Sequence, residues 1–210
     1  MTSPGETNNS FAAVVVTGGS SGIGKSFIQL AAKLGRDPLI CNLSRRNPAG
    51  KNTQLAGVAL HHFPCDFSRP REVEAAGGEV VRLIGAQAPA GRILLVNNSG
   101  VGSFGAFPGP DPARELAIVD VNVRAVVALT ARLLPLLRAR GGGIINVASL
   151  VAYQPTPYAA TYGASKAFLL HWSLALREEL RGTGVAVLAV CPGTTRTDFF
   201  GPDGPVAAAP

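Results

Sequence analysis

The stretch Thr17-Gly18-Gly19-Ser20-Ser21-Gly22-Ile23-Gly24 decides how the rest of the chain is arranged. It follows an apolar run, residues 11–16, that is typical of a buried parallel strand. It opens a segment, residues 23–34, whose apolar side chains recur at helical spacing. Glycines let a ligand approach the backbone closely, and the free N–H groups of a helix N-terminus attract negative charge. The stretch therefore predicts a phosphate site, with an ordinary glycine-rich turn as the alternative. Its spacing, Gly18-x-x-x-Gly22-x-Gly24, differs from the common G-x-G-x-x-G.

Beyond this stretch, apolar strands alternate with helical segments along the chain. Further strands are predicted at 38–43, 58–63, 92–96, 143–147 and 185–190, and helices at 71–87, 113–138 and 159–180. Such alternation specifies an α/β fold, a doubly wound parallel sheet of about six strands with helices on both faces. We expect one Rossmann-type domain over residues 11–198, with disordered tails at 1–10 and 199–210.

The composition disfavours several other classes of protein. Apolar residues make up 47% of the 210 and charged residues 15%, which suits a buried sheet. The net charge is +6, but the arginines are dispersed and no basic run is interleaved with aromatics, so we expect no nucleic-acid partner. We also expect no signal peptide, no membrane partner and a cytoplasmic location. Cys41, Cys65 and Cys191 are scattered, which favours small buried residues over a metal site or a disulfide.

Polar residues and glycines follow the predicted strands, each just beyond the carboxyl end of a strand. Ligands of an open α/β sheet bind at this edge, so we expect these residues to share one crevice. They are Gly18, Arg45, Asp66, Asn97, Ser149 and Gly193. His61 and His62, by contrast, lie within a strand without companion ligands, and we expect them to have packing or surface roles.

The segment Tyr162-Gly163-Ala164-Ser165-Lys166 carries the candidate chemistry. Residues four apart lie on one face of a helix, so Lys166 lies near Tyr162. A phenol with an ordinary pKa of about 10 is a poor acid–base group at neutral pH, and a nearby ammonium lowers that pKa. We expect Lys166 to make Tyr162 usable for proton transfer, with Ser149 donating a hydrogen bond to the same substrate oxygen. The pair alone is also typical of an ordinary amphipathic helix face.

Together, these motifs resemble the short-chain dehydrogenase/reductase family over residues 14–197. The glycine-rich stretch matches the family's cofactor motif, and residues 97–100 match its Asn-Asn-Ala-Gly, with Ser99 in place of Ala. Ser149 and the Tyr-x-x-x-Lys segment match its catalytic residues, and residues 192–197 match the Pro-Gly motif beside the nicotinamide. Asp66 resembles the acidic residue that contacts the adenine, and Asn122 the helix asparagine that helps to hold a proton-relay water.

The resemblance implies an NADPH-dependent oxidoreductase that transfers a hydride between nicotinamide and a small carbonyl or secondary alcohol substrate. Tyr162 would be the general acid in reduction and the base in oxidation, aided by Asn122, Ser149 and Lys166, and no metal is implied. The implied cofactor-binding residues are Gly18, Ser20, Ser21, Gly22, Ile23, Gly24, Ser44, Arg45, Asp66, Asn98, Gly100, Tyr162, Lys166, Pro192, Gly193, Thr195 and Thr197. It also implies a homo-oligomer formed through the helices that contain Asn122 and Tyr162.

The choice of cofactor can be argued from the end of the second predicted strand. NAD-dependent enzymes place a carboxylate there to bind the ribose 2′-hydroxyl. This chain has Leu43-Ser44-Arg45-Arg46, and a guanidinium fork suits a 2′-phosphate. We expect NADP(H) to be preferred, with NAD(H) possible; the alternative is that the two arginines only form a solvated loop.

The chain departs from the family after the Pro-Gly motif. Family members usually continue into a substrate-binding loop, helices and a further strand, whereas this sequence has only residues 198–210. We therefore expect an incomplete substrate region and an uncovered sixth strand. This leaves two alternatives to a reductase: a non-catalytic NADP(H)-binding protein or partner subunit, and another reaction on the same fold, such as epimerisation or dehydration.

Overall fold

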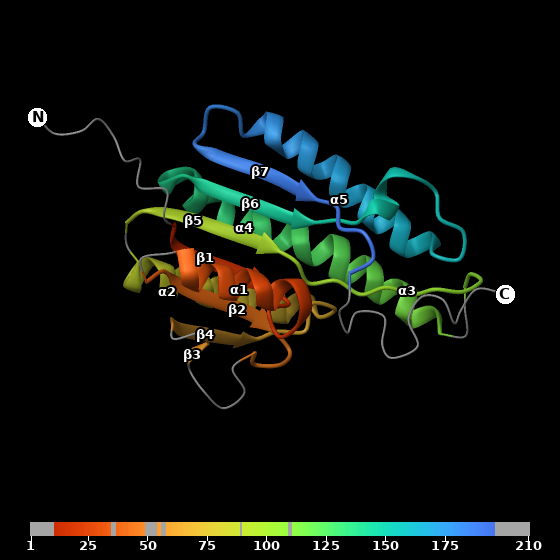
Figure 1. Ribbon diagram of the computed structural model, residues 1–210, viewed down its shortest axis with the longest axis horizontal. Helices are drawn as coiled ribbons and strands as arrows, with labels where there is room; N and C mark the ends of the chain where they lie inside the picture. The colour runs from red at the N-terminus through yellow and green to blue at the C-terminus, as the bar shows by residue number, and fades with distance from the viewer. Residues whose placement is uncertain are drawn as a thin grey trace, which may run out of the picture.

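The computed structural model describes residues 11–34, 37–48, 54–55, 58–88, 90–108 and 111–195. Both predicted tails and the predicted cofactor residue Thr197 lie outside these ranges. The described strands form one sheet in the order β3-β4-β2-β1-β5-β6-β7 (Figure 1). The elements in chain order are β1 (Phe11–Thr17), α1 (Gly22–Leu34), β2 (Leu39–Ser44), β3 (Gln54–Leu55), β4 (Val58–Pro64), α2 (Pro70–Gln87), β5 (Arg92–Asn97), α3 (Pro112–Val119), the π-helical turn η1 (Asp120–Arg124), α4 (Ala125–Arg140), β6 (Gly142–Val147), the 3-10 turn η2 (Leu150–Tyr153), α5 (Ala160–Glu179) and β7 (Val185–Val190).

The predicted doubly wound sheet is confirmed. The chain begins at β1 in the middle of the sheet, moves outward through β2 to β4, and returns to β5 before moving out to β6 and β7. These six strands pair in parallel, whereas the two-residue β3 pairs antiparallel with β4. Strand β3 was not predicted, because two residues are too few to show a periodicity. The strand order reverses between β1 and β5, which is where such sheets bind ligands.

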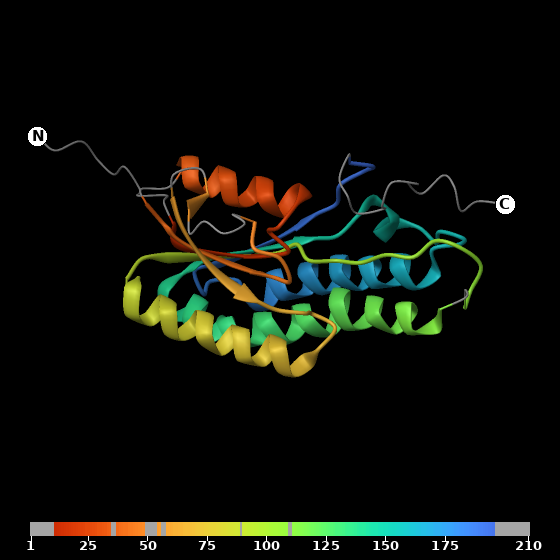
Figure 2. The same cartoon turned by 90° about the horizontal axis from the view of Figure 1, so that it is seen from below.

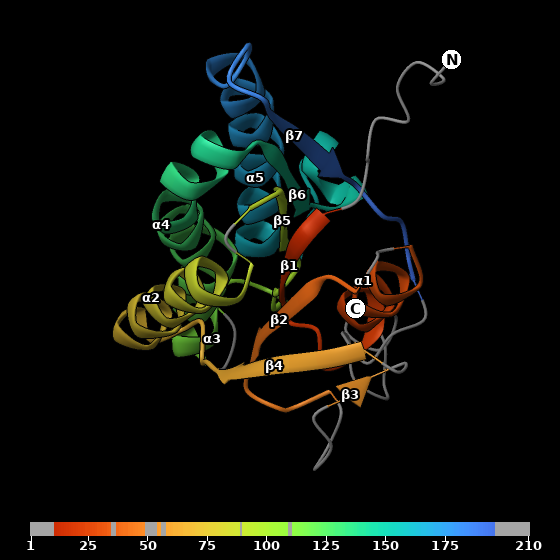
Figure 3. The same ribbon diagram turned by 90° about the vertical axis from the view of Figure 1, so that its left-hand side faces the viewer.

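Helices cover both faces of the sheet, as predicted. Helix α1 lies on one face and α2, α4 and α5 lie on the other (Figures 2 and 3). Val14 and Val16 pack with Ile28 of α1, while Val15 packs in the larger cluster with Leu129 of α4. Because successive strand residues are buried on opposite faces, the strands are continuously apolar rather than alternating. None of the described helices is long and apolar enough to cross a membrane.

The helix predicted over 113–138 is interrupted at its centre. Helix α3 ends at Val119, and η1 closes an i+5 bond from the Ala125 N–H to the Asp120 carbonyl before α4 begins. A π-helical turn inserts one extra residue into the helix, and such turns are frequent at functional sites. The prediction of a single regular helix was therefore wrong at the turn that contains Asn122, because apolar spacing alone does not show an i+5 bond.

The glycine pair of α2 has a packing role that the sequence did not indicate. Glycine within a helix usually weakens it, but Gly77 is buried where α2 packs against α4. A Cβ atom at Gly77 would lie 3.2 Å from Leu129 Cδ1 and 3.4 Å from Arg132 Cγ. The missing side chain therefore lets the two helices approach. By contrast, Gly85 of the same helix is exposed, and no atom lies within 4 Å of the position of its Cβ.

These two glycines should respond oppositely to substitution. Gly85→Ala should raise the free energy of unfolding by about 0.5–1 kcal/mol, because it lowers the entropy of the unfolded chain without a clash. Gly77→Val should lower it by about 1–3 kcal/mol through overpacking against α4. Urea denaturation followed by circular dichroism measures both. Equal effects at the two positions would contradict the packing role of Gly77.

Candidate active site

A cavity of about 770 Å3 opens at the carboxyl ends of the parallel strands. It brings together most of the residues that the sequence predicted for the site. The predicted residues that line it are Gly18, Ser20, Ser21, Gly22, Ile23, Ser44, Arg45, Asp66, Asn98, Gly100, Ser149, Tyr162, Lys166, Pro192, Gly193 and Thr195. Gly24, Asn97 and Asn122 are not among its lining residues, Asn97 because it is buried at the end of β5, and Thr197 lies outside the described residues.

The glycine-rich turn has the conformation that its sequence requires. Gly18 and Gly22 have φ angles of +67° and +53°, which disfavour residues with a Cβ. A Cβ at Gly24 would lie 2.4 Å from both the Gly18 carbonyl oxygen and Asn98 Nδ2, so Gly24 lets α1 begin directly against the turn. The first turn of α1 carries no acidic residue. The start of α1 therefore offers backbone N–H groups and a positive dipole end to an anion in the cavity.

Thr17 and Asn98 join the turn to the end of β5. The Thr17 hydroxyl accepts hydrogen bonds from the backbone N–H groups of Asn98 and Ser99, each at 2.9 Å. Asn98 Nδ2 donates to the carbonyl oxygens of Thr17 at 2.9 Å and Gly18 at 3.2 Å. The side chain of Asn98, predicted to bind the cofactor, thus holds the phosphate turn in place from the neighbouring strand.

Asn42 is a site residue that the sequence reasoning missed. Its side chain is fully buried, its Oδ1 accepts from the Gly19 N–H at 2.9 Å, and its Nδ2 donates to Ser44 Oγ at 2.8 Å. Ser44 Oγ in turn donates to the Arg46 carbonyl at 2.7 Å. One amide therefore links the phosphate turn to the loop that follows β2. A polar residue within the apolar run of β2 was the only sequence signal of this role.

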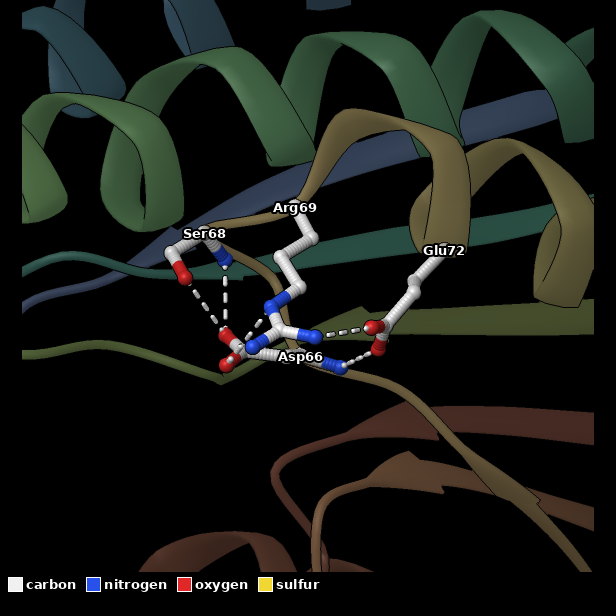
Figure 4. Close-up of polar contacts among 4 residues, drawn as sticks. All are labelled: Asp66, Ser68, Arg69 and Glu72. Carbon is white, nitrogen blue, oxygen red and sulfur yellow. Dashed lines mark hydrogen bonds and ion pairs between the residues drawn. The ribbon is translucent and has the colours of Figure 1, made fainter.

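Asp66 is held by its own loop and by the start of α2 (Figure 4). Its Oδ1 accepts from Ser68 Oγ at 2.7 Å and from the Ser68 N–H at 3.0 Å. Glu72 Oε2 accepts from the Asp66 N–H at 2.8 Å, and Glu72 Oε1 contacts Arg69 Nη1 at 3.2 Å. The Ser68 hydroxyl bond is the main cause of a lowered pKa of Asp66, to which Arg45 also contributes. Asp66 therefore presents an ionised carboxylate in a fixed orientation.

Tyr162, Lys166 and Ser149 come together at the inner wall of the cavity, as predicted. Tyr162 and Lys166 are buried on α5, and Lys166 Nζ lies 5.8 Å from the centre of the Tyr162 ring. Among the described residues, the hydrogen-bond acceptor of Lys166 Nζ is the Val147 carbonyl, at 2.8 Å. Burial lowers the pKa of Lys166 to about 8. Its ammonium group is therefore still protonated at neutral pH.

The predicted effect of Lys166 on Tyr162 was wrong for this arrangement. Burial raises the pKa of Tyr162 above its ordinary value of 10.0, and the hydrogen bond with the Ser149 side chain opposes that rise. The Lys166 ammonium lies over the ring and bonds to a backbone carbonyl, so it does not offset the burial of the phenol. At neutral pH the Tyr162 hydroxyl therefore keeps its proton.

Asn122 supports the site from outside the cavity. Its Nδ2 donates to the Val101 carbonyl and to Ser165 Oγ, both at 2.9 Å, and its Oδ1 accepts from the Val101 N–H at 3.0 Å. The side-chain amide thus joins the loop after β5 to α5, and both of its N–H hydrogens have protein acceptors. A role in proton relay stays a prediction for this residue.

Comparison with known proteins places these features in a family. The sequence model of the family described as short chain dehydrogenase matches residues 12–205. The ketoacyl reductase HetN of Nostoc sp. is 32% identical over 186 residues, which cover 86% of this chain but only 62% of that protein. A short-chain dehydrogenase from Sphingobium yanoikuyae, solved in complex with NADPH, is 31% identical with a TM-score of 0.78 over 90% of this chain and 73% of that chain. The 3-ketoacyl-(acyl-carrier-protein) reductase of Brucella melitensis, solved with NADH, is 28% identical with a TM-score of 0.77, over 89% and 77% of the chains.

The contact between Asn42 and His62 predicts how stability depends on pH. Asn42 Nδ2, which can only donate, lies 2.9 Å from His62 Nδ1, so the ring is neutral and Nδ1 accepts. Burial is the main cause of a lowered pKa of His62. As the pH falls, the His62 ring takes up a proton near pH 6.5 in the unfolded chain and only at a lower pH in the folded chain. The free energy of unfolding should therefore fall as the pH drops below 6.5. His62→Gln keeps an acceptor without a titrating ring.

Urea denaturation between pH 5 and pH 8 tests this expectation. The wild-type chain should lose stability on the acidic side of about pH 6.5, and His62→Gln should flatten that part of the curve. His61→Gln, on the neighbouring position of β4, is the matched control and should leave the curve unchanged. If the His62→Gln variant lost as much stability below pH 6.5 as the wild-type chain does, the assigned contact between Asn42 and His62 would be contradicted.

Proposed function

Because the chain belongs to the short-chain dehydrogenase family, we propose that it is an oxidoreductase that uses NADP(H) to interconvert carbonyl compounds and secondary alcohols. The observation that carries this proposal is the convergence of Ser149, Tyr162 and Lys166 on the cavity that also contains the glycine-rich turn. A dinucleotide bound across the β1–β5 reversal would bring its reactive end to these three residues. The Nostoc relative, a ketoacyl reductase of which the match covers 62%, supports this proposal.

The lining residues fit an NADP(H) molecule along the cavity. The start of α1 offers donors for the diphosphate, and Asp66 offers a fixed carboxylate for the adenine amino group. Ser44 and Arg45 follow β2 without a carboxylate, which suits a 2′-phosphate. The NADPH complex of the Sphingobium protein supports this preference, and the NADH complex of the Brucella protein supports NAD(H) as a possible substitute.

The proposed chemistry assigns one task to each catalytic side chain. The nicotinamide, when bound, supplies or accepts the hydride. The Tyr162 hydroxyl donates a proton to the substrate oxygen in reduction and removes it in oxidation. Ser149, which is hydrogen-bonded to Tyr162, polarises the same oxygen. Lys166 has two N–H donors beyond its bond to Val147, and we assign them to the nicotinamide ribose. Because the Tyr162 hydroxyl keeps its proton at neutral pH, the free protein holds this side chain in the form that carbonyl reduction requires.

Tyr162→Phe should separate catalysis from binding. The variant lacks the proton donor, so turnover of ketones and aldehydes should fall at least about 100-fold. Loss of NADPH absorbance at 340 nm with a matching gain of alcohol measures turnover, and NADPH fluorescence measures binding, which should survive. Tight NADPH binding by the wild-type chain without reduction of any carbonyl would instead support the non-catalytic binding protein. Product formation without net NADPH consumption would support epimerisation or dehydration.

Arg45→Ala should reveal the proposed 2′-phosphate contact. Removal of a charged donor should raise the Kd of NADPH about tenfold, while the Kd of NADH, which lacks the phosphate, should stay nearly constant. Arg82→Ala, an exposed arginine of α2, removes the same charge away from the cavity and is the control. A parallel change in both Kd values would show that Arg45 does not select NADP(H).

We further propose a homo-oligomer formed through α4 and α5 and a cytoplasmic location. Both helices expose large apolar side chains, with Phe168 38% and Leu174 45% exposed on α5 and Val127 37% exposed on α4. Phe168 also stacks on Trp172, which broadens the apolar surface of α5. These exposed apolar side chains, together with the stack of Phe168 on Trp172, support contact with a second copy of the chain. Light scattering that gives the mass of one chain would contradict the oligomer, and cell fractionation tests the location.

A further inference from the structure

Five charged side chains line the cavity among the described residues, and two of them, Arg46 and Arg114, have no part in the proposed function. Arg45 and Arg46 follow β2, Asp66 follows β4, and Lys166 lies beside Tyr162. The fifth, Arg114, belongs to α3, which lies beyond the carboxyl ends of the central strands (Figure 1). Arg114 therefore enters the cavity from a different element than the residues assigned to the cofactor.

Arg114 belongs to the wall that faces Tyr162. Arg114 and Ala117 of α3 and Val121 of η1 all line the cavity, and their i, i+3 spacing places Arg114 and Ala117 on one face of α3. Ile118, in the next turn after Arg114, packs in a buried cluster with Tyr162. Phe104 packs against the same cluster and also lines the cavity, and its ring lies 6.1 Å from the ring of Tyr162. A substrate whose carbonyl reaches Tyr162 therefore meets an apolar wall with Arg114 at its outer end.

The guanidinium of Arg114 is held in a defined orientation. Nε and Nη2 donate to the Gly102 carbonyl at 3.2 and 2.9 Å, which fixes one edge of the group against the loop after β5. The second edge carries the two parallel N–H bonds of Nη1 and Nη2. Among the described residues, this edge has no hydrogen-bond acceptor. Two parallel donors in one plane match the two oxygens of a carboxylate.

Neighbouring acidic groups of the described chain do not neutralise Arg114. Glu115 Oε1 accepts from Ser103 Oγ at 2.5 Å, and the Asp111 carboxylate accepts from the Ala113 N–H at the start of α3. Neither forms an ion pair with Arg114, and neither lines the cavity. Arg114 is thus a charged group on the same wall as Ala117 and Val121, and none of the ion pairs among the described residues involves it.

We propose that Arg114 binds a carboxylate at the far end of the substrate, so that the substrate is an oxo acid whose carbonyl and carboxylate are separated by an apolar segment. This inference rests on the proposed reductase function and names its substrate class. The carbonyl lies at Ser149 and Tyr162, the methylene groups lie along Ala117 and Val121, and the carboxylate takes the open edge of Arg114. The Gly102 carbonyl acts as a positioning group that aims the guanidinium.

The experiment compares acids with matched neutral compounds. 4-Oxopentanoate, 5-oxohexanoate and 6-oxoheptanoate are each assayed beside their methyl esters, with NADPH at saturation. The variants are Arg114→Gln, Arg114→Lys and the control Arg82→Gln, which makes the same change of net charge on α2 outside the cavity. In parallel, calorimetry measures binding of each acid and ester to the NADPH-saturated protein, and to the protein alone.

The wild-type protein should have a higher kcat/KM for at least one acid than for its ester. Arg114→Gln should lower this preference about tenfold, mainly by raising the KM of the acid, because a charge-assisted pair of hydrogen bonds is lost. Arg114→Lys should retain more of the preference than Arg114→Gln, and Arg82→Gln should leave it unchanged. If Arg114→Gln lowered kcat/KM equally for the acid and for its ester, Arg114 would only support the loop that contains Gly102, and the proposal would be overturned.

Two further outcomes separate this inference from the proposed function. Reduction of neutral ketones without any preference for acids would contradict the role of Arg114 and leave the reductase intact. No reduction of any carbonyl would contradict the reductase, and binding would then decide the role of Arg114. In that case, acid binding that exceeds ester binding and is lost in Arg114→Gln would support the carboxylate site, whereas equal or absent binding would overturn it.

Discussion

The hydroxyl of Thr17 joins the two strands between which the order of the sheet reverses. It accepts from two successive N–H groups at the end of β5, and Asn98 returns a bond to the Thr17 carbonyl. In an open parallel sheet, a crevice forms at the carboxyl ends of two neighbouring strands when the connections that follow them run to opposite sides of the sheet. These bonds set the phosphate turn on one side of that crevice and the loop after β5 on the other. The positions of both the cofactor residues and the substrate wall depend on this junction.

Two buried side-chain amides connect this junction with more distant parts of the site. Asn42 is fully buried and connects the phosphate turn with the loop after β2, while Asn122, 1% exposed, connects the loop after β5 with α5. A buried amide without partners would be costly, so each is stable only when the segments on either side occupy their places. Residues that touch no ligand therefore set the geometry of those that do. Asn42 bonds to Ser44 directly, whereas Asn122 bonds to Ser165, whose hydroxyl donates to the Tyr162 carbonyl at 2.7 Å.

Much of the candidate site could be predicted because its residues follow strand ends in a regular way. Gly18, Asp66 and Ser149 each come directly after an apolar run, and the parallel sheet brings such positions to one edge whatever the loops between them do. The roles of Asn42 and Arg114 could not be predicted. Asn42 accepts from the N–H of Gly19, which lies 23 positions earlier, and the guanidinium of Arg114 is held by the carbonyl of Gly102, in a loop without regular structure. No local periodicity or motif records either contact.

The amino-acid sequence by itself determined the fold class, the family and the polar residues that follow the strand ends in the cavity, because these follow from alternating apolar segments and from motifs of short range. Only the tertiary structure decided the electrostatics and orientation of those groups. Burial raised the pKa of Tyr162 although Lys166 lies beside it, since desolvation depends on every neighbour and not on the i+4 spacing. The π-helical turn at Asn122 and the fixed edge of Arg114 likewise arise from packing of α3 and α5 against the loop after β5. Such contacts exist only once segments far apart in the chain are brought together.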